Sequence, residues 1–345
     1  MWRLFKKLSS GIAIDLGTAN TLIYQQGRGI VYREPSVVAR RRKTKEILAV
    51  GREAKKMIGK TPEAIEAFYP LRNGVIADFD AAQAMLSYYL GKLNGEGFWS
   101  RLSQKIVVIG TPSGSTEVER RALSEAVLEA GAQRCYLIEE PMAAAIGAQL
   151  PVEQAKGILI CDIGGGTTEI AVISLSGIVL NRSLKMAGHK MDEMIVKFLR
   201  LKYSLLVGQL TAEKIKIDVG TALPQEKEKQ IVIRGQNLEK GLPITIKINS
   251  AEIREAIAPV LNKILSALEE VIEESPPELV GDFLEEGIIL CGGGAYLPGI
   301  DQLFSQRIKM PATIVDDPQA AVVLGCHHLL ENIQLRKEVQ ITTIF

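Results

Sequence analysis

Two aspartates, Asp15 and Asp162, end apolar runs and are followed by turns suited to phosphate. After each aspartate a glycine stands two residues on and a threonine six residues on. Backbone N–H groups in a glycine-containing turn can approach phosphate oxygens without steric hindrance. A carboxylate would repel phosphate unless a cation lay between them, and Mg²⁺ held through water suits both groups. We therefore predict that Asp15 and Asp162 hold hydrated Mg²⁺ beside phosphate; the alternative for either one alone is a cap of its own turn.

The two aspartates lie in segments of the same pattern, 12–23 and 159–170. In each segment an apolar run of strand length, a glycine-containing turn and a second apolar run follow one another, and a third strand comes after the next turn. A repeat of this kind predicts two similarly folded halves. Each half would present one hairpin tip, and a ligand would be clamped between the two tips.

The rest of the chain alternates between strand-like and helix-like segments, which indicates an α/β protein. Thr116 and Glu119 predict the start of a helix over 116–130, and two prolines end another over 251–274. The last helix, 318–331, is expected to return to the first half. The other expected elements are strands at 46–50, 106–109, 136–138, 230–248 and 287–291, and helices at 53–58, 80–93, 142–150, 191–203 and from 212.

A second glycine run, 292–294, follows the expected strand 287–291 and precedes a helix. Ribose or adenine can rest on bare backbone at such a place. A glycine triplet alone is usually only a turn, so this prediction depends on the order of all the elements together.

The composition is that of an ordinary globular protein, with 47% apolar and 23% charged residues. Its 345 residues allow two domains, and a net charge of +1 selects neither nucleic acid nor membrane. Four cysteines without a C-x-x-C pair are expected to be buried free thiols in a reducing cytoplasm. No apolar stretch approaches the roughly 20 residues of a membrane span. The basic run 40–45 is expected to be a solvated hairpin rather than a polyanion site.

Four motifs carry a family resemblance: Asp-Leu-Gly-Thr-Ala-Asn-Thr at 15–21, Ile-Glu-Glu-Pro-Met-Ala-Ala-Ala-Ile-Gly at 138–147, Asp-Ile-Gly-Gly-Gly-Thr-Thr-Glu at 162–169 and Gly-Gly-Gly-Ala at 292–295. With them the chain resembles the actin and DnaK-type ATPase superfamily. Across nearly its whole length it resembles the MreB family of rod shape-determining bacterial actins.

The resemblance implies a duplicated actin-like (ribonuclease H-like) α/β fold, with two domains and a nucleotide cleft between them. The implied first domain covers 1–145, has a small insert at about 33–65 and is completed by 316–345. The implied second domain covers 146–315 and has a small insert at about 181–245.

The resemblance also assigns ATP-binding positions. They comprise two phosphate loops, a helix that reaches the ribose and a glycine turn beneath the adenosine: Thr18, Ala19 and Asn20; Gly164, Gly165 and Gly166; Glu213, Lys214, Ile215 and Lys216; Gly292, Gly293, Gly294 and Ala295. The cofactors implied are ATP and Mg²⁺, with the metal held through water by Asp15 and Asp162.

Hydrolysis is implied at Glu140, Thr167, Asp162 and Asp15. Glu140 matches the family's water-positioning carboxylate, and a base at a helix start could orient water in line with the γ-phosphate, assisted by Thr167. Alternatively, or in addition, Glu140 complements the helix dipole. His189 stands where relatives commonly carry an acidic residue, so we expect nucleotide binding to survive and turnover to be slow.

Two apolar segments suggest a membrane anchor. Trp2, Leu4, Phe5 and Leu8 alternate with three basic residues, as in a segment lying among lipid headgroups; the alternative is a frayed tail. Phe98 and Trp99 follow a glycine-rich loop, where MreB relatives insert a hydrophobic loop; the alternative is that they pack into the core.

The resemblance therefore implies an ATPase that assembles head to tail into single or paired filaments. It would be cytoplasmic and peripheral on the inner face of the cell membrane, with the cell-wall elongation machinery as partner and no nucleic acid, and would maintain rod shape. The alternative is a sugar or acetate type of small-molecule kinase on the same fold, although the sequence shows no extra insertion to build a substrate pocket. A chaperone ATPase is disfavoured because no β-rich peptide-binding segment follows.

Overall fold

The computed structural model describes residues 9–93, 104–339 and 341–344. Its largest sheet has six strands in the order β19-β10-β9-β1-β2-β3. β1 pairs antiparallel with β2 and parallel with β9, which in turn pairs parallel with β10. The strands are β1 (Ser9–Leu16), β2 (Asn20–Gln25), β3 (Gly29–Pro35), β9 (Gln104–Thr111), β10 (Arg134–Glu139) and β19 (Thr342–Ile344).

A five-stranded sheet repeats this arrangement in the order β13-β12-β11-β17-β18. β11 pairs antiparallel with β12 and parallel with β17, as β1 does with β2 and β9. The predicted repeat is therefore confirmed, and with it the duplicated α/β fold. The strands are β11 (Ile158–Ile163), β12 (Thr168–Ser174), β13 (Gly177–Leu184), β17 (Ile288–Cys291) and β18 (Ala312–Ile314).

Burial on both faces explains why the central strands are continuous apolar runs rather than alternating ones. Every residue of β11 and β12 is buried, and Ile12, Ala13 and Ile14 of β1 are fully enclosed. Such strands need helices on both sides of the sheet. On one face these helices are α3 (Phe79–Lys92) and α5 (Glu117–Glu129) for the first sheet and α9 (Ser250–Glu274), α10 (Pro277–Glu286) and α11 (Ile300–Ile308) for the second. The helices on the other face belong to a cluster between the two sheets, described below. None of the helices within the described ranges is long and apolar enough to cross a membrane.

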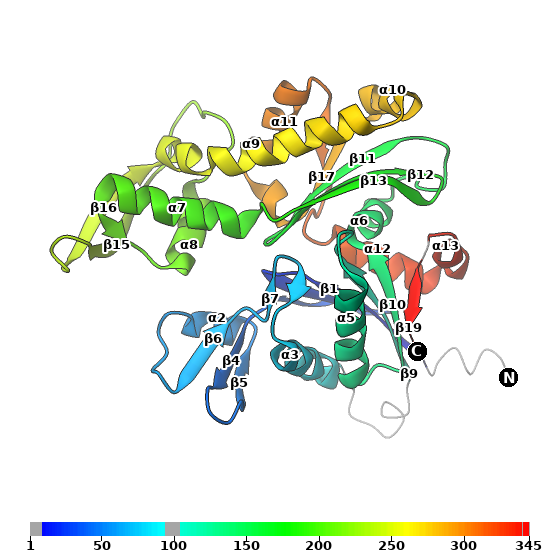
Figure 1. Cartoon of the computed structure of the whole chain (residues 1–345), viewed down its shortest axis with the longest axis horizontal. Coiled ribbons are helices and arrows are strands. Elements are labelled where there is room, and N and C mark those ends of the chain that lie inside the picture. The colour runs from blue at the N-terminus through cyan, green and yellow to red at the C-terminus, as the bar shows by residue number, and fades with distance from the viewer. Residues whose placement is uncertain (1–8, 94–103, 340, 345) are drawn as a thin grey trace.

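Each large sheet carries a smaller one, and Figure 1 shows both at the same side of the molecule. The first has β4 (Val38–Arg41), β5 (Ile47–Val50) and β6 (Ile65–Phe68) with α2 (Arg52–Met57). The second has β14 (Leu205–Leu206), β15 (Gln230–Asn237) and β16 (Pro243–Asn249) with α7 (Gly188–Tyr203) and α8 (Gln209–Val219). A short hairpin, β7 (Leu71–Arg72) and β8 (Val75–Ile76), lies between β6 and α3 in the chain.

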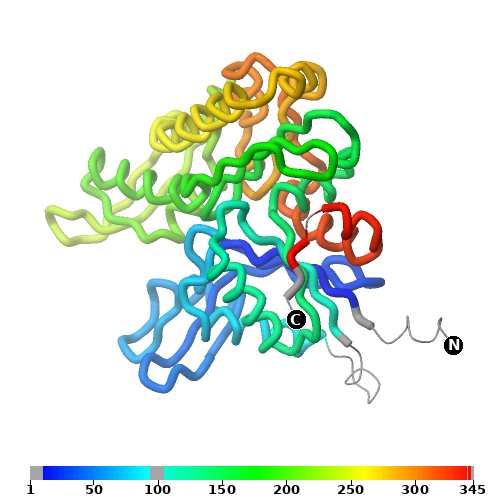
Figure 2. The backbone as a smooth tube through the Cα atoms, turned by 45° about the vertical axis from the view of Figure 1, so that its right-hand side comes forward, coloured from blue at the N-terminus to red at the C-terminus, as the bar shows by residue number. Residues whose placement is uncertain are grey.

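One continuous cluster of buried side chains, here called the shared core, joins the two large sheets. It contains Ala13 and Val108 from the first sheet together with Ile160 and Ala171 from the second. Helices α6 (Glu140–Gly147) and α12 (Ala321–Glu331) belong to it, and α13 (Ile333–Glu338) follows them in the chain. Figure 2 shows the C-terminal segment, orange to red, returning beside the strands of the first half, as predicted.

Glycines let α6 and α12 cross with their backbones in contact. A Cβ at Gly147 would lie 1.9 Å from the carbonyl oxygen of Ala321, and one at Gly325 only 1.8 Å from that of Ala143. Helix α12 begins at residue 321 rather than 318, and the Pro318 carbonyl accepts a hydrogen bond from the Gly292 N–H (2.7 Å).

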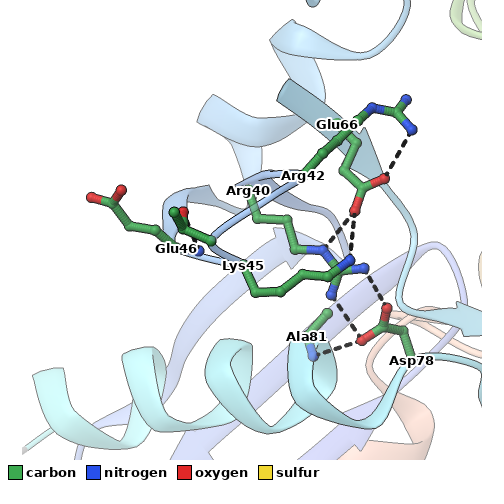
Figure 3. A network of polar contacts seen from close by, with 8 residues as sticks. Arg40, Arg42, Lys45, Glu46, Glu66, Asp78 and Ala81 are labelled. Carbon is green, nitrogen blue, oxygen red and sulfur yellow. Dashed lines mark hydrogen bonds and ion pairs between the residues drawn. The ribbon is translucent and has the colours of Figure 1, made fainter. Parts of the chain in front are cut away.

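The basic run 40–45 is not simply a solvated hairpin, because its first arginine points inward. Figure 3 shows Arg40 between Glu66 and Asp78, with N···O distances of 2.7 Å to each carboxylate. Its guanidinium also lies 4.6 Å from the ring centre of Phe68. Since Asp78 caps α3 by accepting from the Ala81 N–H, Arg40 fastens the small sheet β4–β6 to that helix. The run still forms the β4–β5 connection, and its exposed members lie at the tip.

The predicted free thiols are confirmed, because the structure forms no disulfide with Cys135, Cys161, Cys291 or Cys326 and all four are buried. The capping box predicted at Thr116 and Glu119 also forms, and α5 follows it.

Candidate functional site

A cavity of about 410 Å³ lies where the two hairpin tips meet. Its walls come from the β1–β2 and β11–β12 turns, the starts of α6 and α7, helix α8 and the glycine run after β17. Predicted site residues that line it are Asp15, Thr18, Ala19, Asn20, Glu140, Asp162, Gly164, Gly165, Gly166, Thr167, Glu213, Lys216, Gly292, Gly293 and Gly294.

The two tips approach so closely that glycine is required in one of them. A Cβ at Gly165 would lie 2.4 Å from the Cβ of Ala19, and one at Gly166 would lie 2.4 Å from Oγ1 of Thr18. The same Thr18 hydroxyl accepts a hydrogen bond of 2.8 Å from the N–H of Gly74. The phosphate loops predicted from separate parts of the sequence are thus brought together, with Gly74 of the β7–β8 turn beside them.

Four carboxyl groups line this cavity without a cation of their own among the described residues. Burial raises the pKa of Asp15 to about 7. Burial, with added repulsion from Asp15 and Glu169, raises the pKa of Asp162 to about 8. The pKa of Glu169 is raised to about 7, chiefly by burial, and burial together with the other three carboxylates raises that of Glu140 well above its ordinary value. A divalent cation placed among them would relieve this repulsion.

Glu140 is placed by the junction of a strand and a helix. β10 ends at Glu139, α6 begins at Glu140, and Pro141 in the first turn fits because that position needs no N–H donor. A Cβ at Gly110, at the end of neighbouring β9, would lie 3.2 Å from the Glu140 Cγ. The carboxyl group therefore stands at a helix N-terminus inside the cavity, so both sequence interpretations of it are compatible with its position.

The glycine run after β17 packs directly against β11, the strand that contains Asp162. Gly292 has a φ of 78°, and a Cβ there would lie 2.1 Å from Oδ1 of Asp162. A Cβ at Gly294 would lie 2.3 Å from Cγ2 of Ile163. Bare backbone is thus necessary here for packing alone, and it leaves a smooth wall on which a sugar or base fits. Ala295 is buried beneath this wall and does not line the cavity.

Helix α8 contributes only some of the four residues predicted from it. Glu213 and Lys216, one turn apart, line the cavity, whereas Lys214 is exposed and Ile215 is buried in the second half. Glu213 also forms an ion pair across the cleft with Lys55 of α2 (2.7 Å). Lys216 donates to Asp192 and to the Gly188 carbonyl oxygen, both at 2.8 Å.

His189 lies in the first turn of α7, against the second phosphate loop. Its backbone N–H donates to the Gly165 carbonyl oxygen (2.8 Å), and its ring meets the edge of Tyr69 at 5.1 Å between centroids. Burial, followed by repulsion from Lys216, lowers the pKa of His189, so the imidazole is neutral at pH 7. A neutral ring here cannot reproduce an acidic side chain, and slow turnover remains a prediction.

Sequence reasoning did not single out several residues that line the cavity, among them Glu169, Ile217 and Tyr296. Glu169 follows the second glycine loop and pairs in register with Asp162, so its place in the motif was a usable signal. The sequence held no such signal for Ile217 and Tyr296, because an apolar side chain in a helix or turn is ordinarily predicted to lie in the hydrophobic core.

No three His, Cys, Asp or Glu side chains within the described ranges converge into a metal-binding group. The proposed magnesium site thus depends on two aspartates and water. The predicted membrane residues Trp2, Leu4, Phe5, Leu8, Phe98 and Trp99 all lie outside the described residues.

A duplicated α/β fold with paired glycine loops facing one cavity defines the class of actin-like proteins. Solved structures agree: MreB5 of Spiroplasma citri bound to ADP has a TM-score of 0.90 and 39% identity, covering 96% of this chain and 98% of that one. A MamK double helical filament has a TM-score of 0.80 at 21% identity, which supports the fold alone.

The family model MreB/Mbl protein matches residues 9–338, and the chain belongs to the MreB/Mbl family. It is 45% identical over 322 residues to the cell shape-determining protein Mbl of Bacillus subtilis (strain 168), covering 93% of this chain and 96% of that protein. It is 45% identical over 331 residues to the cell shape-determining protein MreB of Escherichia coli (strain K12), covering 95% of each. These relatives support an actin-like cytoskeletal protein that determines cell shape, and not the kinase alternative.

Proposed function

We propose that this protein binds ATP with Mg²⁺ in the cleft, hydrolyses it and assembles into filaments on the inner face of the cytoplasmic membrane. There the filaments organise cell-wall synthesis and maintain rod shape. The observation that carries the nucleotide site is the meeting of two glycine loops over four carboxyl groups that have no cation of their own among the described residues. Relatives support it too, since MreB5 of Spiroplasma citri has been solved with ADP and with AMPPNP.

The residues present fit a hydrated magnesium ion and a triphosphate. Asp15 and Asp162 would accept hydrogen bonds from water bound to the ion, which suits a cation that keeps several waters. Bound Mg²⁺ would neutralise part of the negative charge of the phosphates. The N–H groups of the two tips would hold the phosphates, and Lys216 lies on the cavity wall as a further cation.

The hydrolytic step is assigned to Glu140, at the N-terminus of α6. Its carboxylate would hold the attacking water and accept a proton from it, assisted by Thr167, which lines the same cavity. Burial, with repulsion from Asp15, Glu169 and Asp162, raises the pKa of Glu140 well above its ordinary value and so makes its carboxylate a stronger base. A bound cation would draw that pKa down again and favour the ionised form.

Assembly and membrane attachment rest on the family and on the amino-acid sequence. A head-to-tail contact joins two different surfaces, and it gives an open filament when the rotation between subunits does not close a ring. One short apolar segment binds lipid weakly, whereas many aligned along a filament bind strongly. Deleting residues 2–8 together with Phe98→Ser and Trp99→Ser should abolish liposome binding and spare nucleotide binding; retained liposome binding would refute the anchor.

The central experiment combines ATP turnover with sedimentation. The purified protein should release phosphate from Mg-ATP and pellet with anionic liposomes, and Asp162→Ala should remove the magnesium-dependent turnover. Glu153→Ala, an exposed acidic residue outside the cavity, is the control and should behave as wild type. A protein that stays monomeric while phosphorylating a sugar would instead establish the kinase alternative.

A further inference from the structure

One histidine lines the cavity, and its side chain has no part in the magnesium site or in the hydrolytic step proposed there. The chain contains three histidines, all within the described ranges, and His189 is the one at the cavity wall. Its backbone N–H donates to the Gly165 carbonyl oxygen at 2.8 Å, and that of the preceding Gly188 donates to the Gly164 carbonyl oxygen at 3.2 Å. The backbone of His189 is therefore fixed against the second phosphate loop, with a titratable imidazole beside it.

The imidazole ring also touches the other half of the molecule. Tyr69, in the connection between β6 and β7, meets it edge to face, with ring centroids 5.1 Å apart and ring planes at 63°. The Nε2 atom of His189 is buried and has no hydrogen-bond partner within the described part of the chain. A protonated imidazole carries an N–H donor on both nitrogens, so its charged form would leave a buried donor unpaired in the nucleotide-free protein.

The surroundings of the ring favour its neutral form in the nucleotide-free protein. The titratable groups around it come from three helices and one connection: Lys55 of α2, Tyr69 between β6 and β7, Asp192 and Glu193 of α7, and Glu213 and Lys216 of α8. Burial, followed by repulsion from Lys216, lowers the pKa of His189, and attraction by Glu213 is too small to reverse this. Glu213 is itself paired with Lys55 at 2.7 Å. His189 is accordingly neutral at pH 7 and able to accept a proton when further negative charge comes near.

Phosphate groups bound at the loop 164–166 would reverse this balance. A nearby negative charge favours the charged form of a histidine, and charges inside a cleft are screened less than charges on an open surface. The ordinary pKa of histidine, 6.5, is so close to neutrality that a modest rise is enough to charge the ring at pH 7. His189 would therefore take up a proton as the ligand arrives, and the charged ring would attract the phosphates in return.

We propose that His189 is a further ligand-binding residue of the cleft, which takes up a proton when polyphosphate binds and attracts the polyphosphate by charge. Tyr69 is a positioning residue that keeps the imidazole against the phosphate loop. This inference rests on the proposed nucleotide binding and adds to it a proton that binds together with the ligand. Because the protein with ligand holds this proton up to a higher pH than the protein alone, the affinity contributed by His189 should rise as pH falls.

Proton NMR of the imidazole ring measures the charge of His189 directly. Since the chain has three histidines, comparison with His189→Gln identifies the resonance. Its pH titration is recorded for the protein alone and with saturating magnesium tripolyphosphate, which has neither base nor ribose. The midpoint should move to higher pH with the ligand, and the two histidines of α12, outside the cavity, serve as internal controls. A midpoint that stays or falls would overturn the proposal.

Calorimetry measures the consequence for affinity. Dissociation constants of Mg-ATP and magnesium tripolyphosphate are compared for wild type and His189→Gln at about pH 8 and about pH 6. Asp15 and Asp162 also titrate, but in both proteins alike, so the ratio of the two dissociation constants isolates His189. That ratio, variant over wild type, should grow about fivefold on going to the lower pH, for both ligands. His328→Gln, a histidine outside the cavity, is the matched control and should bind as wild type does.

The positioning role of Tyr69 has a readout of its own. Tyr69→Leu keeps an apolar side chain and loses the ring that contacts His189. In the Tyr69→Leu background, replacing His189 by glutamine should change the ratio only about twofold between the two pH values, because the imidazole is no longer held against the loop. A fivefold change in that background would refute the role of Tyr69.

The outcomes separate this inference from the proposed function. Wild-type protein that binds neither Mg-ATP nor magnesium tripolyphosphate would overturn the nucleotide site and the role of His189 with it. Tight binding by wild type, with an affinity ratio that is the same at both pH values, would overturn the role of His189 alone. Thermal unfolding at the wild-type temperature establishes that each variant is folded, and His189→Asn replaces His189→Gln if the latter is not.

Discussion

The acidic cluster of the cleft and the acidic cluster around Arg40 contain the same residue types in opposite electrostatic states. Hydrogen bonding from Arg40 lowers the pKa of Glu66, and the same guanidinium outweighs burial to lower that of Asp78. In the cleft, burial raises the pKa of Asp15 to about 7 and that of Asp162 to about 8. The small sheet has its cation built into the chain, whereas the four carboxyl groups of the cleft have no such partner among the described residues.

The difference distinguishes structural from functional acids. A carboxylate whose partner is an arginine stabilises the fold at neutral pH, and its removal should harm stability first. A set of buried carboxylates without such a partner destabilises the fold, so its presence points to a ligand. Four changes test this distinction, from the largest expected effect to the smallest.

Glu140→Gln should lower ATP turnover about 100-fold or more, because the amide cannot accept a proton from water. Binding of Mg-ATP should stay within about threefold, since the side-chain shape is kept. Phosphate release at saturating Mg-ATP and calorimetry measure the two quantities. Glu139→Gln, the neighbouring glutamate outside the cavity, should leave turnover near wild type. Equal losses in both variants would contradict the assignment.

Arg40→Met should destabilise the protein by about 3 kcal/mol, because it leaves the carboxylates of Glu66 and Asp78 without their partner. Arg40 has only 8% of its side chain exposed, whereas Arg41, paired with Glu46, has 53%. Arg41→Met should therefore cost less than about 0.5 kcal/mol. Urea denaturation measures both free energies, and similar values for the two variants would remove the distinction.

The stability of the nucleotide-free protein should fall as pH rises from about 4 to about 8. Over that range the unfolded chain releases the proton of Asp162, whose ordinary pKa is 3.8, while the folded protein retains it until about pH 8. Asp162→Asn removes this contribution and should raise stability at pH 8. For Glu66 and Asp78 the sign is reversed: their lowered pKa values give stability that is lost as pH falls below about 4. Thermal unfolding is measured across pH in wild type and in Asp162→Asn. A wild-type stability that rises between about pH 4 and about pH 8 would contradict the assignment.

The pair Lys55–Glu213 should show the smallest effect. It crosses the cleft, but the two side chains are 25% and 21% exposed, so a double-mutant cycle with Lys55→Met and Glu213→Gln should give a coupling of about 0.5 kcal/mol. Repeating the cycle with Mg-ATP present would show whether Glu213 exchanges Lys55 for the nucleotide. Identical coupling with and without nucleotide would leave Glu213 as a structural residue.

The amino-acid sequence predicts much of this architecture because the repeat is local and regular. Asp15 and Asp162 mark equivalent strand ends, and the apolar runs before them follow from burial on both faces. Helix phase is a finer matter: Glu213 and Lys216 face the cavity, whereas Ile215 between them faces the core. A four-residue motif on a helix cannot lie wholly on one side, since successive residues point in different directions.

The amino-acid sequence could not predict which charged residues form ion pairs with one another. Arg40 finds Glu66 and Asp78, which are 26 and 38 residues further along the chain, and many other acids are as near. The same holds for Tyr296, whose partners Asp317 and Arg33 come from separate parts of the fold. Such contacts depend on tertiary packing, which no local pattern encodes.

The shared core has a consequence for how this molecule melts. Because Ala13 and Val108 of one sheet pack in a single interior with Ile160 and Ala171 of the other, each half buries part of its hydrophobic surface only against the other half. A fragment containing either half alone would turn part of that interior toward water. Heating should accordingly unfold the whole chain in one cooperative step, with equal calorimetric and van't Hoff enthalpies, rather than domain by domain.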